Sequence, residues 1–538
     1  MTTSLQWWQT SVIYQVLASS FMDSDGDGEG DLQGVIGRLD YLQWLGVGAI
    51  WLTPIYPSPM ADLGYDVSDY TGVNSRFGSL EDFDRLVTDA HARGIRIIMD
   101  WVPNHTSDQH PWFVESRSSR DSAKRDWYIW RAAKDTDQPP TNWLAVFGGS
   151  AWEWDEATGE FYYHSFLESQ PDLNWRNPEV QAAVFDAMRF WLRRGVDGFR
   201  IDAASWLIKD AQFRDNPPNP NYRPESDGPD QEVMPLYTWD QPGVHEVMAN
   251  TRRVLEEFDD RLLMGELVLP IESMVEYYGK TYPELHLPLN MHPIWADWNA
   301  EDLGKVVETY ERERPASGWA TWTASTHDFA RIASRLRGDQ TRVAAMLLLT
   351  LGGTPTHYYG EEIGMTGVPI PPEEAKDPQG QRIGRNRDPA RTPMQWDASR
   401  GAGFTTGEPW LPIGDDVRTA NVAAQREDPR SLLTLYRRLI ELRTQHPVLV
   451  GGSLEVVSQH NPLLVYRRTS EDGEYLVVLN LSGEPQSYGI WQARGQLLVS
   501  TFLDQPDKEI RDKIELRANE GILMRMSYVP PPASKTVT

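Results

Sequence analysis

Short apolar runs alternate with longer stretches in which apolar residues recur at helical spacing over most of the chain. A continuous apolar run of about four to eight residues is typical of a buried strand, and a period near 3.6 indicates an amphipathic helix. The predicted strands are 11–16, 49–53, 95–101, 198–202, 262–266, 286–290, 321–325 and 355–359. The predicted helices are 32–45, 80–93, 180–194, 245–258, 342–351 and 432–445. Eight strands that alternate with helices predict a parallel sheet closed into a (β/α)8 TIM barrel.

Long connections interrupt this alternation. Residues 106–173 are rich in Trp, Pro, Asp and Gly and predict a lobe inserted after the third strand, and residues 206–238 are predicted to wall the barrel mouth. After residue 450 the pattern changes to alternating strands, which indicates a small antiparallel β domain. We therefore expect a barrel domain in two parts, an inserted domain and a C-terminal β domain, with the bounds 1–105 and 174–450, 106–173, and 451–538.

Composition narrows the classes of protein that are compatible with this pattern. The chain has 51 Lys and Arg against 78 Asp and Glu, a formal charge of −27, and such a surface repels nucleic acid and anionic membranes. Cysteine is absent, which excludes disulfides, thiol nucleophiles and cysteine-ligated metals. The first residues lack the pattern of a secretory signal, and no apolar segment approaches membrane-spanning length. We expect a cytoplasmic monomer or small homo-oligomer that binds a small molecule, without nucleic-acid or membrane partners.

Acidic residues stand repeatedly at the carboxyl ends of the predicted strands. Asp100 ends the third strand, Asp202 the fourth and Glu266 the fifth, and Asp328 follows the seventh. In a barrel these ends meet at one mouth, where active sites lie. Clustered carboxylates raise one another's pKa, a cost that is tolerated where a proton is held near neutral pH. Glycoside hydrolysis needs two carboxyl groups beside the scissile bond, and a separation of about 5 Å suits double displacement.

Four ordered motifs carry a family resemblance. They are Asp-Trp-Val-Pro-Asn-His at 100–105, Gly-Phe-Arg-Ile-Asp at 198–202, Gly-Glu at 265–266 and His-Asp at 327–328. Together they resemble the motifs of glycoside hydrolase family 13, the α-amylase family. Gln-Pro-Asp-Leu-Asn at 170–174 resembles the motif of its oligo-1,6-glucosidase-like members, and residues 265–270 with 286–290 look most like bacterial α-glucosidases. The resemblance runs from about residue 12 to residue 527 and implies a retaining, exo-acting α-glucosidase with transglycosylation as a side activity.

The resemblance also implies a role for each matching residue. Asp202 would be the nucleophile, Glu266 the acid/base and Asp328 the transition-state stabiliser. Arg200 lies two residues before Asp202 on the same strand, so its side chain points to the same side and would keep Asp202 ionised. The other residues expected to bind the sugar are Asp62, Tyr65, His105, Phe147, Phe166, His327 and Arg391. For Phe147 and Phe166, core packing is an alternative. Thr326 departs from the Asn that usually opens the last motif.

Residues 23–31, Asp-Ser-Asp-Gly-Asp-Gly-Glu-Gly-Asp, alternate acids with small residues. Hard divalent cations take oxygen ligands, and glycines let a short loop wrap around them. The segment begins like an EF-hand, but Gly34 stands where its final Glu would be. The family resemblance implies a structural Ca²⁺ or Mg²⁺ and no organic cofactor. Its predicted ligands are the side chains of Asp23, Asp25, Asp27 and Asp31 and the carbonyl of Glu29. An acidic solvated turn is the alternative.

The residue after the nucleophile bears on linkage. It is Ala203, and within the family valine there resembles α-1,6-specific members whereas alanine or threonine resembles α-1,4-preferring ones. A smaller side chain changes the space beside the bond being cut, which favours maltose-like substrates here. The alternatives are an oligo-1,6-glucosidase, a trehalose synthase or a sucrose hydrolase of the same family. A more remote one is a non-catalytic amylase-like interaction domain.

Overall fold

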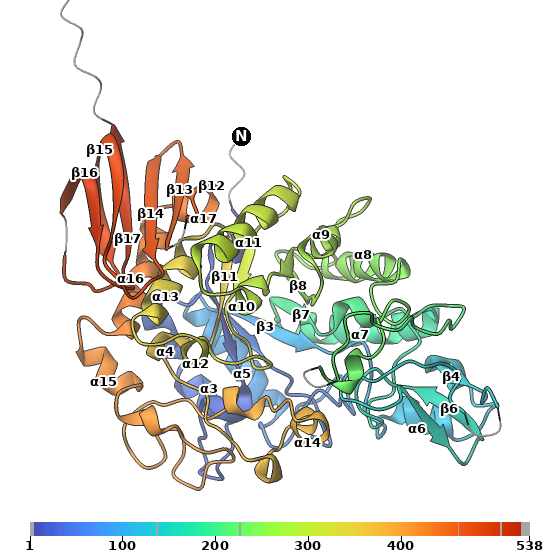
Figure 1. Ribbon diagram of the computed structural model, residues 1–538. Coiled ribbons are helices and arrows are strands. Elements are labelled where there is room, and N and C mark those ends of the chain that lie inside the picture. Colours follow the sequence, from blue (N-terminus) through green and yellow to red (C-terminus); the bar gives the residue numbers. More distant parts are fainter. Residues whose placement is uncertain (1–4, 136–137, 225–226, 461, 506–507, 529–538) are drawn as a thin grey trace, which may run out of the picture.

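The largest sheet of the protein consists of eight parallel strands (Figure 1). The computed structural model describes residues 5–135, 138–224, 227–460, 462–505 and 508–528. The strands are β1 (Ile13–Val16), β2 (Ala49–Leu52), β3 (Arg96–Trp101), β7 (Gly198–Ile201), β8 (Leu262–Glu266), β9 (Leu287–Leu289), β10 (Thr321–Thr323) and β11 (Thr354–Tyr358). Their order is β10-β11-β1-β2-β3-β7-β8-β9. The N–H of Thr323 in β10 donates to the carbonyl of Asn290 after β9, at 3.0 Å, and so joins the two ends. The predicted barrel is confirmed.

Helices separate the barrel strands along the chain. The longer ones are α5 (Leu80–Ala92), α7 (Pro178–Arg193), α8 (Gly243–Leu255), α11 (Ala300–Glu313), α13 (Gln340–Thr350) and α16 (Leu432–Gln445). The single helix predicted over 32–45 is wrong, because α3 (Leu32–Gly37) and α4 (Leu39–Leu45) meet at Arg38, whose backbone leaves the helical region. Gly34 and Gly37 weaken the helix on the N-terminal side of this break.

The barrel interior is filled by every second residue of the strands. Trp51, Ile98 and Met264 belong to a buried cluster that is separate from the larger core between the sheet and its helices. Their neighbours Ile50, Ile97 and Leu263 pack into that larger core, since successive side chains of a strand point to opposite faces. The same alternation decides which of the polar side chains at the strand ends face inward.

Two smaller sheets flank the barrel and lie at opposite ends of the molecule in Figure 1. The first has three strands, all within 106–173: β4 (Trp130–Arg131), β5 (Trp152–Asp155) and β6 (Glu160–Tyr163). The second is antiparallel, in the order β12-β13-β14-β17-β15-β16. Its strands are β12 (Ser453–Ser458), β13 (Leu463–Ser470), β14 (Gly473–Asn480), β15 (Gln486–Ser500), β16 (Glu509–Leu516) and β17 (Gly521–Tyr528). The C-terminal β domain is present as predicted.

Two buried arginines lie near each other where the barrel meets the C-terminal sheet, and one of them, Arg468, connects the two. Arg443 of α16 donates to the carbonyls of Leu349 and Leu351 at 2.9 and 3.1 Å, at the end of α13. Arg468 of β13 donates to the carbonyl of Thr350 at 2.8 Å and to that of Leu449 at 3.0 Å. Burial lowers the pKa of Arg443 to about 9 and that of Arg468 to about 10, so both remain charged at neutral pH.

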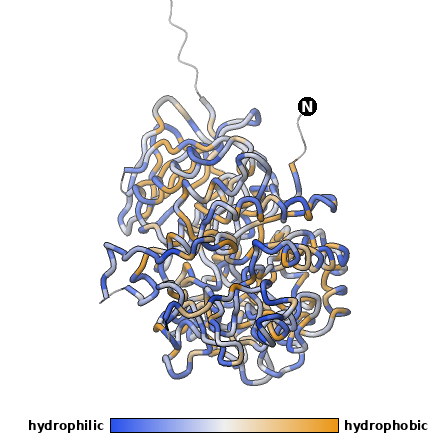
Figure 2. The backbone as a smooth tube through the Cα atoms, turned by 90° about the vertical axis from the view of Figure 1, so that its right-hand side faces the viewer, coloured by the Kyte–Doolittle hydropathy of each residue, from blue (hydrophilic) through white to orange (hydrophobic). Residues whose placement is uncertain are grey.

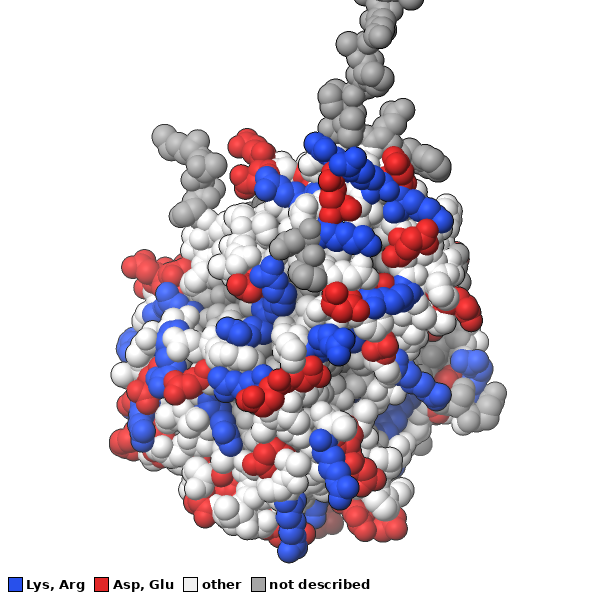
Figure 3. Space-filling view, turned by 90° about the vertical axis from the view of Figure 1, so that its left-hand side faces the viewer, with Lys and Arg blue, Asp and Glu red and all other residues white. Residues whose placement is uncertain are grey.

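The excess of acidic residues does not gather into one patch on the face shown in Figure 3, where blue and red side chains are interspersed. Figure 2, turned the opposite way, shows hydrophilic residues concentrated in the outer loops. Among the described residues, no helix combines the length and the apolar character that crossing a membrane requires.

Candidate active site

The carboxyl ends of β3, β7 and β8 bring four charged side chains together in the barrel. Asp100 and Arg200 are paired across β3 and β7, and Arg200 pairs with Met264 of β8. Met264 belongs to the cluster inside the barrel. Residues paired with Met264, and those two positions further along each strand, therefore also point to the barrel interior. Glu266 is two residues beyond Met264, and Asp202 is two residues beyond Arg200. These four polar side chains therefore end the column of apolar residues that fills the barrel.

Arg200 is shared by three carboxylates. Its Nη1 lies 2.8 Å from Asp100 Oδ1 and 2.8 Å from Asp202 Oδ1, and its Nη2 lies 2.9 Å from Glu266 Oε2. The guanidinium also lies over the ring of Trp51, 4.9 Å from its centroid. The contact predicted between Arg200 and Asp202 is present, and the same guanidinium holds Glu266 beside it.

One cation cannot neutralise three buried carboxylates. Burial raises the pKa of Asp202 well above its ordinary value, Arg200 opposes this, and the neighbouring carboxylates add to it. Burial likewise raises the pKa of Glu266 against the opposing charge of Arg200. The expectation that Arg200 keeps Asp202 ionised is not met, because burial and the neighbouring carboxylates outweigh the charge of Arg200. In the structure, Asp202 and Glu266 form a site that retains a proton well above the usual carboxyl range.

Asp328 has a different environment from Asp202 and Glu266. Arg387 Nη1 and Arg391 Nη2 each lie 3.0 Å from Asp328 Oδ1. Burial opposes ionisation, but His327 and the two guanidinium groups hold the pKa of Asp328 below its ordinary value. Thr326 Oγ1 accepts a hydrogen bond from the main-chain N–H of Asp328 at 3.2 Å. Asp328 is therefore an ionised acceptor beside a carboxyl pair that retains a proton.

Asp62 is connected to Asp328 by the same arginine. Arg387 Nη2 lies 2.8 Å from Asp62 Oδ1, and Gln170 Nε2 donates to Asp62 Oδ2 at 3.1 Å. Burial raises the pKa of Asp62 to about 6 in spite of Arg387. Arg387 is itself held by Asp377 Oδ1, 2.6 Å from its Nη2. One guanidinium thus connects two carboxylates that were predicted to bind the same sugar.

The predicted histidines are buried and neutral. Burial lowers the pKa of His105 to about 4 and that of His327 to about 3. The hydroxyl of Tyr65 lies 2.7 Å from His327 Nε2 and donates to Asp100 Oδ2 at 3.0 Å. The rings of Tyr65 and His327 are stacked, with centroids 5.4 Å apart. Near pH 7 both imidazoles are uncharged hydrogen-bonding groups.

Acid should destabilise the fold through these histidines. The pKa of His105 is about 4 in the folded protein against an ordinary 6.5, so between these values the unfolded chain binds a proton that the folded protein does not. We expect the free energy of unfolding to fall from pH 6.5 to pH 4, with about 3 kcal/mol from His105. Urea unfolding at several pH values measures this. The variant His105→Gln should show a shallower decline, and the exposed His460→Gln should not; an equal decline in all three would contradict it.

A cavity of about 520 Å³ connects these groups. Of the predicted residues, its wall includes Asp62, Tyr65, His105, Phe147, Phe166, Asp202, Glu266, His327 and Asp328. Arg200 and Arg391 are 1% exposed and are not among the lining residues, so they contact the carboxylates from behind the wall. The predicted catalytic and sugar-binding residues therefore converge on one site.

Arg387 is the main site residue that the sequence did not reveal. It lines the cavity and lies over the ring of Phe147, 4.9 Å from its centroid. Its segment, 368–410, is rich in Arg and Asp but has no hydrophobic period that would place it. Asp100 was predicted to stand at the barrel mouth and Gln170 belongs to one of the quoted motifs, but neither was given a role of its own in binding the sugar. The abundance of arginine was the only available signal for Arg387.

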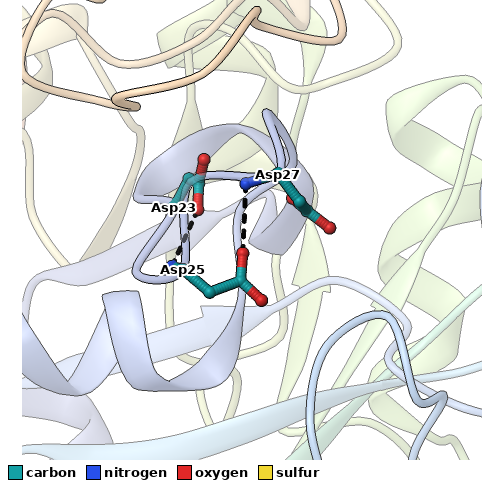
Figure 4. Close-up of side chains that lie close together, drawn as sticks. All are labelled: Asp23, Asp25 and Asp27. Carbon is teal, nitrogen blue, oxygen red and sulfur yellow. Dashed lines mark hydrogen bonds between the residues drawn. The ribbon is translucent and has the colours of Figure 1, made fainter.

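The acidic loop after β1 brings three of its predicted ligands together (Figure 4). One carboxylate oxygen from each of Asp23, Asp25 and Asp27 lies within 4.8 Å of the others. Main-chain N–H groups of Gly26 and Gly28 donate to Asp23 at 2.6 and 2.9 Å. Gly28 has φ +97°, and a Cβ there would lie 1.9 Å from the carbonyl oxygen of Glu408. An oxygen-only donor set of this kind fits a hard divalent cation.

The side chain of Asp31 lies outside this group, and the carbonyl of Glu29 stays a prediction. The carboxylate of Asp31 accepts hydrogen bonds from Ser24 N–H at 2.8 Å and from Gly34 N–H at 2.7 Å, so it caps the start of α3. The carboxylate of Glu29, which was expected to contribute only its carbonyl, lies 3.3 Å from Arg76. The structure thus brings together three side chains of the predicted metal site.

Comparisons with known proteins agree with this geometry. Residues 15–452 match the family described as the catalytic domain of α-amylase. An oligo-1,6-glucosidase of Parageobacillus thermoglucosidasius is 38% identical, with 96% of this chain and 98% of the relative covered. A probable α-glucosidase of Rhizobium meliloti is 40% identical, with 93% and 95% covered.

A solved structure of an α-glucosyl transfer enzyme superposes with a TM-score of 0.92 at 36% identity, with 97% of this chain and 100% of that chain covered. These similarities cover nearly the whole chain, and they agree with the barrel fold and with the acidic cluster at its mouth. The chain belongs to the α-amylase family of glycoside hydrolases.

Proposed function

We propose that the protein is a retaining, exo-acting α-glucosidase that releases glucose from the nonreducing end of short, preferentially α-1,4-linked glucosides. The observation that carries the proposal is the position of Asp202 and Glu266 on the two terminal nitrogens of one buried guanidinium. That places two carboxyl groups side by side at the cavity wall with at least one proton between them. A closely spaced pair of this kind suits double displacement.

In the first step, the Asp202 carboxylate attacks the anomeric carbon while the carboxylic acid of Glu266 gives its proton to the glycosidic oxygen. The bond to the leaving group breaks, and the aglycone departs as a neutral alcohol. In the second step, Glu266 takes a proton from water as the water oxygen attacks the same carbon and releases Asp202. The two inversions return the α-configuration. An alcohol in place of water gives transglycosylation.

The neighbouring groups would hold the terminal glucose. Asp328 remains ionised between two arginines and can accept hydrogen bonds from sugar hydroxyls. Asp62, connected to it by Arg387, supplies a second acceptor, and the neutral His105 and His327 complete the set. Asp62, His105 and His327 are 5%, 1% and 2% exposed, so this end of the cavity is closed, which favours a terminal sugar over a continuing chain.

The preference for α-1,4 linkages is based on Ala203. Its main-chain N–H donates to Glu266 Oε2 at 3.2 Å, and its small side chain lines the cavity beside the proton donor. Relatives include both oligo-1,6-glucosidases and α-glucosidases. Trehalulose synthases are among the similar solved structures, so sugar isomerisation remains the second candidate.

A turnover panel of maltose, isomaltose, sucrose, trehalose and maltotriose tests the proposal. We expect maltose and maltotriose to be cleaved fastest, with α-glucose as the first anomer detected by NMR. Glu266→Gln should reduce turnover of maltose about 10³-fold, because the natural leaving group needs a proton; the exposed Glu272→Gln is the matched control. First release of β-glucose would refute retention, faster cleavage of isomaltose would refute the linkage, and formation of trehalose from maltose would refute hydrolysis as the main activity.

We also propose that the loop with Asp23, Asp25 and Asp27 binds a structural divalent cation. Its carboxylates are close together, and glycines allow the main chain to turn around them. The cation would offset their mutual repulsion and brace the loop between β1 and α3, at a distance from the reacting groups along the chain. The cation would take no part in the reaction steps.

A further inference from the structure

Gln15 of β1 is a polar residue inside the barrel. Its side chain is fully buried, and it pairs in the sheet with Trp51 of β2 and with Tyr358 of β11. Ile13, two residues earlier on the same strand, belongs to the apolar cluster that fills the barrel, so Gln15 also points inward. Gln15 is not among the residues that line the cavity, so it can act on the site only through a neighbour.

The amide of Gln15 is only half engaged. Its Nε2 lies 2.8 Å from His327 Nδ1, whereas its Oε1 has no hydrogen-bond partner within the part of the chain that the structure describes. A buried polar atom without a partner costs free energy that an apolar side chain of similar length, such as methionine, does not. The stability of the barrel therefore does not account for this amide, and its one side-chain contact is with a residue of the cavity wall.

The contact with Gln15 determines where the proton of His327 lies. An amide nitrogen only donates, so Nδ1 of His327 must accept. Burial lowers the pKa of His327 to about 3, so near pH 7 the ring carries a single proton, which is then on Nε2. Nε2 lies 2.7 Å from the hydroxyl of Tyr65 and 3.2 Å from Asp328 Oδ2. The N–H of His327 is therefore directed at residues that are expected to hold the sugar.

The hydrogen bonds beyond His327 agree with this position of the proton. The hydroxyl of Tyr65 donates to Asp100 Oδ2 at 3.0 Å, so its oxygen can accept the proton of His327 Nε2. With the proton on Nδ1 instead, the lone pair of Nε2 would face the carboxylate of Asp328. Tyr65 would then have to leave Asp100 in order to donate to the ring. The chain of hydrogen bonds from Gln15 to Asp100 thus has one consistent direction of donation.

The same contact opposes a second proton on His327. A histidine beside a carboxylate ordinarily gains a proton and forms an ion pair with it. Here that proton would have to go on Nδ1, toward which the N–H of Gln15 already points. Protonation would bring two N–H groups face to face. Without it, His327 stays a neutral donor, and Asp328 keeps its capacity to accept hydrogen bonds from other groups.

We propose that Gln15 is a positioning residue for the sugar site: its amide donates to Nδ1 of His327, keeps the ring proton on Nε2 and holds the imidazole neutral. Asp328 is thereby left available to the hydroxyls of the terminal glucose. This last step rests on the proposed function, whereas the position of the proton does not. Gln15 does not contact the substrate, and its effect is exerted through His327.

Neutron diffraction from crystals of the unmodified enzyme in heavy water tests the position of the proton. We expect deuterium on Nε2 of His327, none on Nδ1, and the deuterated nitrogen of the Gln15 amide facing the ring. Deuterium on Nδ1, or the amide oxygen of Gln15 facing the ring, would overturn the inference. The measurement needs no turnover, so its outcome is independent of which glucoside the enzyme cleaves.

Two substitutions separate this role from simple packing. Gln15→Glu keeps the shape of the side chain, but its carboxylate accepts where the amide donates. It should draw a proton onto Nδ1 and convert His327 into an imidazolium paired with Asp328, which lowers kcat/KM for maltose about 30-fold. Gln15→Met removes the donor without supplying an acceptor, so the fall should be smaller, about fivefold. Its unfolding free energy in urea should be retained or increased, because the unpartnered oxygen is gone.

The matched control is Thr356→Val, which removes another buried polar atom from the inside of the barrel. The hydroxyl of Thr356, paired with Ile13 in the sheet, has no hydrogen-bond partner among the described residues, so kcat/KM should be unchanged. Equal losses of kcat/KM in Gln15→Glu and Gln15→Met, or a loss of stability at full activity in both, would identify Gln15 as a packing residue and overturn the inference. If the unmodified enzyme cleaved no glucoside, the proposed function would fail, and the neutron result would still decide the role of Gln15.

Discussion

Replacement of Asp202 by alanine is expected to lower kcat/KM for maltose about 10⁴-fold, because the variant cannot form the glucosyl intermediate. The side chain of Asp202 is nearly buried and contacts Arg200 at 2.8 Å, so its loss leaves a small polar space beside the anomeric carbon. Sodium azide should enter that space and restore turnover of p-nitrophenyl α-glucoside. Because azide would attack from the side that Asp202 occupied, the product should be the β-glucosyl azide. NMR identifies its anomeric configuration.

The matched control is Asp259→Ala, which removes an exposed aspartate and should leave kcat/KM unchanged. Two results would contradict the assignment. One is nearly full activity of Asp202→Ala, and the other is an α-glucosyl azide as the rescued product. The second would show that azide attacked an intact glucosyl-enzyme, so that Asp202 had lain on the face of the leaving group and another carboxylate is the nucleophile.

Replacement of Arg200 by methionine should have the second largest effect, on both activity and stability. Three carboxylates would lose the cation that contacts each of them, at 2.8 to 2.9 Å. Breaking a buried ion pair in this way costs about 3 kcal/mol of unfolding free energy. Arg200 lowers the pKa of Asp202 and of Glu266, so its loss raises both. The acid limb of the kcat/KM profile should therefore move to higher pH, and kcat should fall about 10³-fold.

The pH profile separates an electrostatic role from a merely structural one. Arg200→Lys retains a positive charge and should shift the acid limb less than Arg200→Met does. The exposed Arg193→Met, on α7, should shift neither the profile nor the unfolding free energy. An acid limb at the same pH in Arg200→Met and in the unmodified enzyme would show that Arg200 does not control the protonation of this pair.

The barrel and its catalytic face could be predicted because both follow from local patterns. Strands such as β7 are short and wholly buried, and apart from Arg200 this run is apolar. Because side chains alternate between the two faces of a strand, Arg200 points to the same face as the residue two positions away. Two-residue spacing therefore placed Arg200 beside Asp202. That Glu266 shares the guanidinium depends on the pairing of strands more than sixty residues apart, which local spacing does not specify.

Other features lie outside what local patterns determine. Arg387 contacts Asp62 across a sequence separation of 325 residues, and its loop has no periodic pattern. Asp31 illustrates a different limit: an aspartate before a helix can cap it or bind a cation, and the residue type is the same in both cases. The structure places Asp31 at the cap of α3 and leaves Asp23, Asp25 and Asp27 as the acidic group.

The contacts of Arg443 and Arg468 have a consequence for how the sequence can vary. Both arginines donate to main-chain carbonyls at the end of α13 and near α17 (Val448–Gly451). Every amino acid carries that carbonyl, so most substitutions at Leu349 or Thr350 leave the acceptor in place. These acceptor positions can therefore accept many changes of side chain, provided that Arg443 continues to hold the end of α13 and Arg468 continues to join the β sheet to it. Homologous β domains exchanged between relatives should dock on this barrel if they supply the equivalent of Arg468.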